Sequence, residues 1–162
     1  MEKLRTLIKE LENKIENFEL INPTISSSSV GWHIEHSFLV INVIIEGLKK
    51  SNPNDYKWKF NLKRLYVYSI NKIPRGRGQA PKRVQPQNNF SQESLKNHLA
   101  ITTEKLPELN NLNPHNYIEH PVFGKLNIKP ALKFLFIHTR HHIDIINDII
   151  NKKDNLTDLH NN

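Results

Sequence analysis

The chain contains no cysteine. This absence excludes disulfide bonds, iron–sulfur clusters and thiolate ligands, so any metal ion must be held by nitrogen or oxygen atoms. The sequence also lacks an apolar run near the roughly 18–20 residues that a membrane-spanning helix needs. Its first residues, Met1 to Arg5, enter an amphipathic pattern and do not resemble a signal peptide. We therefore expect a cytoplasmic protein with no membrane partner.

Acidic residues are fewer than basic ones, 16 against 23, which gives a net charge of +7. Such a balance invites a nucleic-acid partner, but the chain is rich in Lys, Asn and Ile throughout, whereas nucleic-acid binders usually concentrate their charge on one face. We therefore discount nucleic acid as the partner. The local basic cluster is Lys72, Arg75, Arg77, Lys82 and Arg83.

The spacing of apolar residues predicts an all-α protein. Apolar residues recur every three or four positions, as on one face of a helix, and no stretch shows the two-residue period of a strand. Serines before the second and third long helices, and Asn127 before the last, can cap them. The length suits a single domain over 1–152, followed by a polar tail, 153–162, that we expect to fray. The four long helices are predicted at roughly 2–20, 28–50, 91–108 and 128–152, with a shorter one at about 58–72.

Two long loops interrupt these helices. Residues 73–89 contain three prolines and two glycines, which exclude regular structure there. A structureless loop of this length in a compact domain is usually functional or disordered. A second loop is predicted at 109–127, directly before the last helix.

Three histidines form the most informative pattern. His138 and His142 lie one turn apart, so they share a face of the last helix. At 100° per residue they fall on its apolar stripe, and His36 falls on the apolar stripe of the helix at 28–50. His33 and His141 fall at the rims of these two stripes.

A single histidine on an apolar face is more often a core residue that donates to a carbonyl group than a metal ligand. Burying three neutral imidazoles without partners would cost on the order of 1–3 kcal/mol each. A shared metal ion would remove that cost for all three. The pair lacks the intervening Glu of a His-Glu-x-x-His protease helix, so spacing alone leaves both readings open.

Several short motifs over residues of about 25–150 resemble the DinB-like (YfiT-like) superfamily of metalloenzymes. The loop at 73–82 is similar to a branch of that superfamily with no assigned function. The motifs are Trp32-x-x-x-His36, His120-Pro-x-Phe-Gly-x-Leu126, His138-x-x-His141-His142 and Ile73-Pro-Arg-Gly-x-Gly-x-Ala-Pro-Lys82.

The resemblance implies a four-helix bundle with one divalent metal ion at one end. Its ligands would be His36, His138 and His142. Some relatives are thiol S-transferases, and many have no known reaction. Many relatives carry Arg-Gly-Gln after the last ligand, where this chain has Ile143-Asp144-Ile145, so no role tied to that stretch is carried over.

Further residues have two readings each. His120 could contact the substrate or support a ligand, or it could shape the turn before the last helix. His141 could orient a ligand or contact the substrate, or it could be an exposed rim residue. Arg75 and Arg77 could bind an anionic group, or they could belong to a solvated loop.

Trp32 is expected to pack against other side chains rather than to stack on a substrate. His98, His115 and His160 are expected at the surface, and no Asp or Glu on the histidine stripe can be named as a general base.

Three functions remain. The first is a metal-dependent enzyme, a hydrolase or thiol S-transferase, whose metal-activated water or thiol attacks a small molecule that is anionic or itself a thiol. Zinc, nickel, manganese and iron all accept imidazole ligands. The second is a non-catalytic metal-binding or structural protein that forms a homodimer. The third is a nucleic-acid-binding stress protein, for which the histidine stripe has no use.

Overall fold

The computed structural model describes residues 1–76, 80–87 and 90–158, with side chains up to Lys152. The protein is mostly helical, which confirms the predicted class, and it has one small antiparallel sheet. No helix in these ranges is long and apolar enough to cross a membrane. The elements are α1 (Glu2–Glu12), α2 (Val30–Lys50), α3 (Leu62–Ile70), α4 (Gln92–Lys105), β1 (Tyr117–His120), β2 (Gly124–Asn127) and α5 (Ile128–Asp158).

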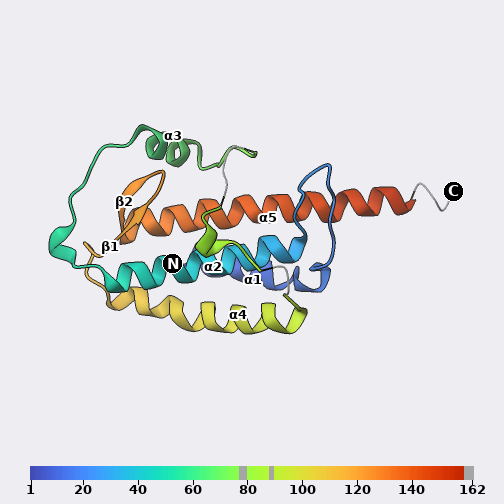
Figure 1. Ribbon diagram of the computed structural model, residues 1–162, viewed down its shortest axis with the longest axis horizontal. Coiled ribbons are helices and arrows are strands. Elements are labelled where there is room, and N and C mark those ends of the chain that lie inside the picture. Colours follow the sequence, from blue (N-terminus) through green and yellow to red (C-terminus); the bar gives the residue numbers. More distant parts are fainter. Residues whose placement is uncertain (77–79, 88–89, 159–162) are drawn as a thin grey trace.

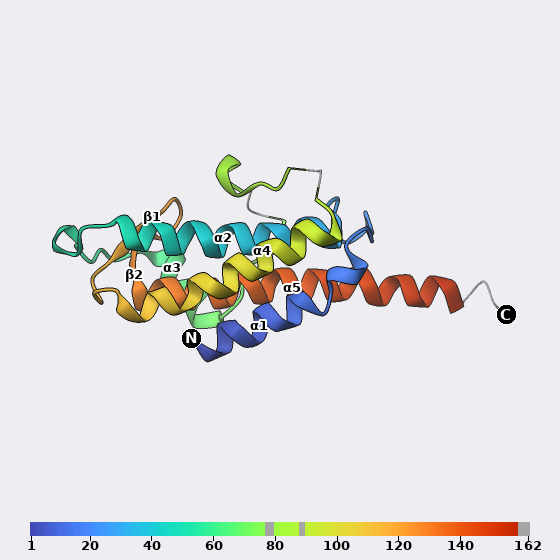
Figure 2. The same ribbon diagram turned by 90° about the horizontal axis from the view of Figure 1, so that it is seen from below.

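Four helices, α1, α2, α4 and α5, lie side by side (Figures 1 and 2). Both α4 and α5 pack against α1 and α2, so the four apolar stripes meet in one core. The shorter α3 lies outside this group, against α5. Fully buried side chains come from all four long helices and include Leu7, Leu11, Ile34, Phe38, Ile41, Leu95 and Leu135.

The first helix is shorter than predicted. It ends at Glu12, and a single 3-10 turn, Ile15–Asn17, follows it. Beyond that turn, the carbonyl groups of Phe18 and Leu20 accept hydrogen bonds from the N–H groups of Gly31 and Val30, both at 2.8 Å. The first N–H groups of α2 lack partners within their own helix. The non-helical segment after α1 supplies two of those partners.

The prediction that the loop at 109–127 contains no strand is wrong. The chain there forms a 3-10 segment, Leu106–Asn111, and then the β1–β2 hairpin. Each strand has only four residues, which is too short for a two-residue period to stand out in the sequence. Gly124 begins β2 with a φ of 69°, a conformation that favours glycine.

Other boundaries also differ from the predictions. The helix expected at 91–108 ends at Lys105, and the helix expected at 58–72 covers only Leu62–Ile70. The last helix continues to Asp158, past its predicted end and into the expected tail. Within the loop at 73–89, Lys82–Val84 form a 3-10 turn. Residues 77–79 and 88–89 of that loop and 159–162 of the tail lie outside the described residues.

Candidate metal centre

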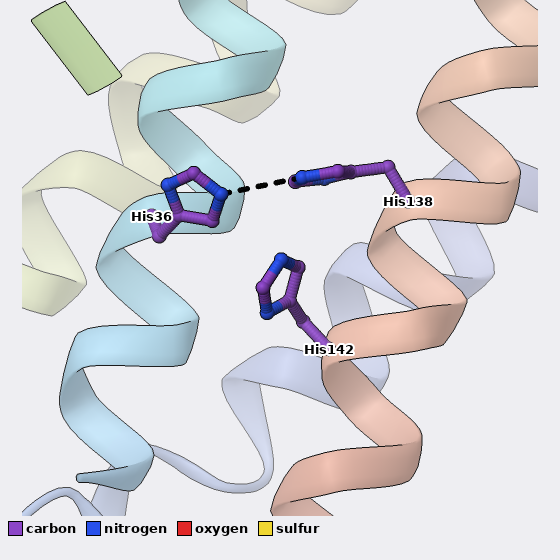
Figure 3. A group of neighbouring side chains, drawn as sticks. All are labelled: His36, His138 and His142. Atoms are coloured by element: carbon purple, nitrogen blue, oxygen red, sulfur yellow. Dashed lines mark hydrogen bonds between the residues drawn. The ribbon is translucent and has the colours of Figure 1, made fainter. Parts of the chain in front are cut away.

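The packing of α2 against α5 brings the three predicted histidines together. His36 lies on α2, and His138 and His142 lie on the facing side of α5 (Figure 3). Each offers one nitrogen, and these three atoms lie within 4.8 Å of one another. His36 and His142 are buried and His138 is partly buried. The three side chains are therefore positioned to hold a metal ion.

The His36 ring is oriented by its surroundings. Its Nδ1–H donates to the carbonyl oxygen of Val84 at 2.7 Å, so Nε2 carries the lone pair and faces His138. Trp32 stacks on the ring at a centroid distance of 4.9 Å and an angle of 18°. The expected packing role of Trp32 therefore includes holding this imidazole in place.

The separation of two of the nitrogens suits a shared ion. Nε2 of His36 and Nε2 of His138 are 3.2 Å apart. Two nitrogens bound to one tetrahedral zinc ion at about 2.0–2.1 Å would be about 3.3–3.4 Å apart. Nδ1 of His138 is buried and has no hydrogen-bond partner among the described residues, so no hydrogen bond at Nδ1 fixes the His138 tautomer there.

His142 is oriented by a histidine that sequence reasoning placed at the rim. Its Nδ1 lies 2.9 Å from Nδ1 of His33, and Nε2 of His33 lies 3.0 Å from the Ser26 hydroxyl. His33 is only 4% exposed, because the segment before α2 folds back over it. The other ring nitrogen of His142 points between His36 and His138 (Figure 3). The signal that could have identified His33 is its i, i+3 spacing to His36.

Burial keeps these imidazoles neutral. It is the main cause that lowers the pKa of His36, that lowers the pKa values of His138 and His142 well below the usual range, and that lowers the pKa of His33 to about 3. The neighbouring histidines lower three of these pKa values further, because two positive charges at close range repel. Neutral imidazoles keep the lone pairs that a metal ion needs.

His120 shapes the turn before α5. Its Nδ1 accepts hydrogen bonds from the N–H groups of Val122 and Phe123, both at 3.2 Å. Phe134 contacts both the His120 ring and the His138 ring, and His120 lies close enough to His138 to lower its pKa. Burial lowers the pKa of His120 to about 4. These contacts favour the turn-shaping reading.

His141 is partly buried and joins the loop to α5. Its ring meets that of His142 edge-on at 5.2 Å, and it lies close to the backbone of Ile73. Burial, with Arg75 nearby, lowers the pKa of His141. The fully exposed rim position is therefore excluded.

Arg75 forms an ion pair with Asp148 at 2.6 Å, and both side chains are nearly half exposed. Arg77 lies outside the described residues, so the anion site stays a prediction.

The remaining histidines, His98, His115 and His160, were expected at the surface, and this prediction is confirmed in part. His98 is not a free surface residue, because its Nδ1 lies 2.7 Å from a carboxylate oxygen of Glu35. This carboxylate comes from α2, so a sequence-remote neighbour decides the environment of His98. His115 is exposed as expected, and His160 lies outside the described residues. In the described part of the chain, no carboxylate joins the three-histidine group.

No protein-family model, curated protein or solved structure matches this chain. Function must therefore be inferred from the chemistry of the three histidines. Three neutral ligands leave the full positive charge of a divalent ion uncompensated and leave at least one coordination position for another molecule. Such a donor set accepts zinc, nickel, manganese or iron.

Proposed function

We propose that the protein binds one divalent metal ion through His36, His138 and His142 and acts as a metal-dependent enzyme on a small molecule. The observation that carries the proposal is the convergence of three neutral imidazole nitrogens within 4.8 Å. The orienting contacts of His36 and His142 add support, since metal-binding histidines usually use their second ring nitrogen in this way.

The proposal includes a place in the DinB-like superfamily and a four-helix bundle. The motifs around His36, His120 and His138 support the superfamily, and the mutual packing of α1, α2, α4 and α5 supports the bundle. When bound, a divalent ion would supply Lewis acidity that makes a water molecule or a thiol nucleophilic near neutral pH. The reaction would accordingly be a hydrolysis or a thiol S-transfer.

Other residues of the chain would orient the metal ligands and bind an anionic substrate. Val84 and His33 hold two of the ligand rings, and the ring of Trp32 covers one face of His36. Arg75 lies close enough to His33 and His141 to lower their pKa values. An anionic substrate would compete with Asp148 for this guanidinium group.

A second candidate function is a structural metal site. One observation favours it: within the described ranges, no Asp or Glu lies with the three histidines to act as a general base. The stability of the metal-free protein distinguishes the two, because a structural ion is needed for folding and a catalytic ion is not.

Metal content tests the proposal. Protein purified without an affinity tag should contain one zinc, nickel, manganese or iron ion per chain by elemental analysis. His138→Ala should lower the affinity by orders of magnitude, because only two ligands remain. His115→Ala is the matched control, since this histidine is exposed, and it should retain wild-type content. Equal metal content in the wild type and His138→Ala would refute the assignment.

A further inference from the structure

A group of large apolar side chains lies exposed on and beside α3. Each is between 45% and 70% exposed, although apolar groups of this size are normally scattered singly over a surface. Elsewhere in the described part of the chain, the only exposed large apolar residues are Ile21 and Ile101. The group, called the α3 patch below, consists of Trp58, Phe60, Leu62, Leu65, Tyr66, Ile70 and Val122.

The two sides of α3 explain the exposure. Arg64 and Val67 are buried on its inner side, and the hydroxyl group of Tyr68 donates to the carbonyl oxygen of Pro130 at the start of α5. At 100° per residue, Leu62 and Tyr66 point the other way. In Figure 1 α3 lies beyond α5, at the outer edge of the molecule. The outer apolar stripe of α3 therefore has no partner among the described elements.

Hydrogen bonds on the inner side of α3 fix the conformation of the patch. The buried guanidinium group of Arg64 donates to the carbonyl oxygens of Lys59, Phe123 and Lys125, at 2.5, 3.4 and 3.3 Å. The Asn61 side chain caps α3 through the N–H of Arg64 and donates to the carbonyl oxygen of Val122. These bonds join the segment before α3, the helix itself and the hairpin. A preformed face loses little conformational entropy when it binds a partner.

We propose that the α3 patch is the interface through which two copies of this chain form a two-fold symmetric dimer. If each of its seven side chains offers on the order of 100 Å², the patch approaches the roughly 800 Å² per partner of a stable interface. Its aromatic content is typical of interface centres. Two-fold symmetry places each α3 against its own copy, so the same residues bury one another.

The charges around the α3 patch predict a different salt dependence for a second copy of the chain than for an anionic partner. Lys57 and Lys59 precede α3, Lys63 lies beside its apolar stripe, and α3 contains no acidic residue. Glu119 of β1 lines the same hollow as Lys59 and Phe60, but the lysines outnumber it. In a symmetric dimer these lysines repel across the rim, and salt screens that repulsion. Dimerisation should therefore strengthen as salt is added. Binding of the same patch to anionic lipid or nucleic acid should weaken instead.

Sedimentation velocity of the full-length chain at several concentrations, in low and high salt, tests the proposal. The wild type should sediment at twice the chain mass of 19.0 kDa, with a dissociation constant that falls as salt rises. Leu65→Glu and Trp58→Ala should each weaken the dimer by at least about 30-fold, as for central interface residues. Helical circular dichroism should be unchanged in both, since these side chains are exposed.

Ile21→Glu is the matched control, because Ile21 is about as exposed as Leu65 and belongs to the segment between α1 and α2. That segment lies toward the other end of the molecule from α3 (Figure 1). It should dimerise like the wild type, and so should His138→Ala, which removes a metal ligand. A monomer at every concentration would overturn the proposal, as would equal effects of Leu65→Glu and Ile21→Glu. So would a monomer that pellets with anionic vesicles or single-stranded DNA and loses that binding in Leu65→Glu.

Discussion

His33 determines the usable nitrogen of His142. Because Nδ1 of His142 faces Nδ1 of His33, Nε2 of His142 can bind a metal only if its Nδ1 carries the proton and donates to His33. His33 must then carry its own proton on Nε2 and donate to the Ser26 hydroxyl. One set of tautomers therefore satisfies every group from Ser26 to the candidate metal site.

We predict that His33→Ala lowers zinc affinity by about 10- to 100-fold, as removal of a ligand's hydrogen-bond partner typically does. Competition with a chromophoric chelator measures this affinity. His33→Gln should recover part of it, because an amide oxygen can also accept from His142. If His33→Ala binds zinc like the wild type, His33 does not orient the ligand.

At the scale of elements, the start of α2 carries the site and is tightly enclosed. A Cβ atom at Gly31 would lie 2.4 Å from the Phe90 ring and 2.9 Å from the Phe18 carbonyl oxygen. The same carbonyl oxygen accepts the hydrogen bond from the Gly31 N–H. The helix start, the segment after α1 and the segment before α4 therefore meet where only glycine fits.

Gly31→Ala should destabilise the fold by about 1–3 kcal/mol, as overpacking does. In an unhindered helix the same change would stabilise by about 1 kcal/mol, so the sign of the effect is informative. Urea unfolding followed by circular dichroism measures it. Ser27→Ala, at an exposed position in the same segment, should change the free energy of unfolding by less than about 0.5 kcal/mol. A more stable Gly31→Ala variant would contradict the close contact.

The molecule as a whole should fold without a metal ion. Its core draws large buried side chains from all four long helices, unlike a small finger that needs zinc to fold. We predict that chelated protein keeps its helical circular dichroism and melts cooperatively at a lower temperature. Metal at a hundredfold excess over its dissociation constant should restore roughly 2.7 kcal/mol.

His36→Ala should melt like the chelated wild type and gain little from added metal, because it lacks one ligand. Loss of the helices on chelation would instead show that the ion is structural. The enzyme proposal would then give way to the second candidate function.

Acid should destabilise the metal-free protein. Burial lowers the folded-state pKa values of His33 and His120 to about 3 and about 4, below the ordinary histidine value of 6.5. Between the folded and unfolded values the unfolded chain binds more protons, so stability falls as pH falls. The melting temperature of chelated protein should therefore be highest above about pH 6.5 and drop steadily toward pH 4. A melting temperature independent of pH across this window would show that these histidines do not titrate in this way.

The local pattern of the chain was sufficient to predict that five helices form in this order and that His138 and His142 share a face, but not where each helix ends. Helical periodicity acts over three or four residues, so it can be read without knowing what lies opposite. The prediction that His36 faces inward from its own helix rests on the same rule.

Contacts between residues far apart in the sequence decided the rest. His33 is buried because the segment around Ser26 covers it, and His98 is paired because Glu35 lies across from it on α2. The segment after the first helix is non-helical where its carbonyl groups accept hydrogen bonds from the start of α2. The outer side of α3 is exposed to solvent because α5 packs only against its inner side. Helical periodicity identifies the apolar face of each helix. Only the tertiary structure decides whether another element packs against that face and buries it.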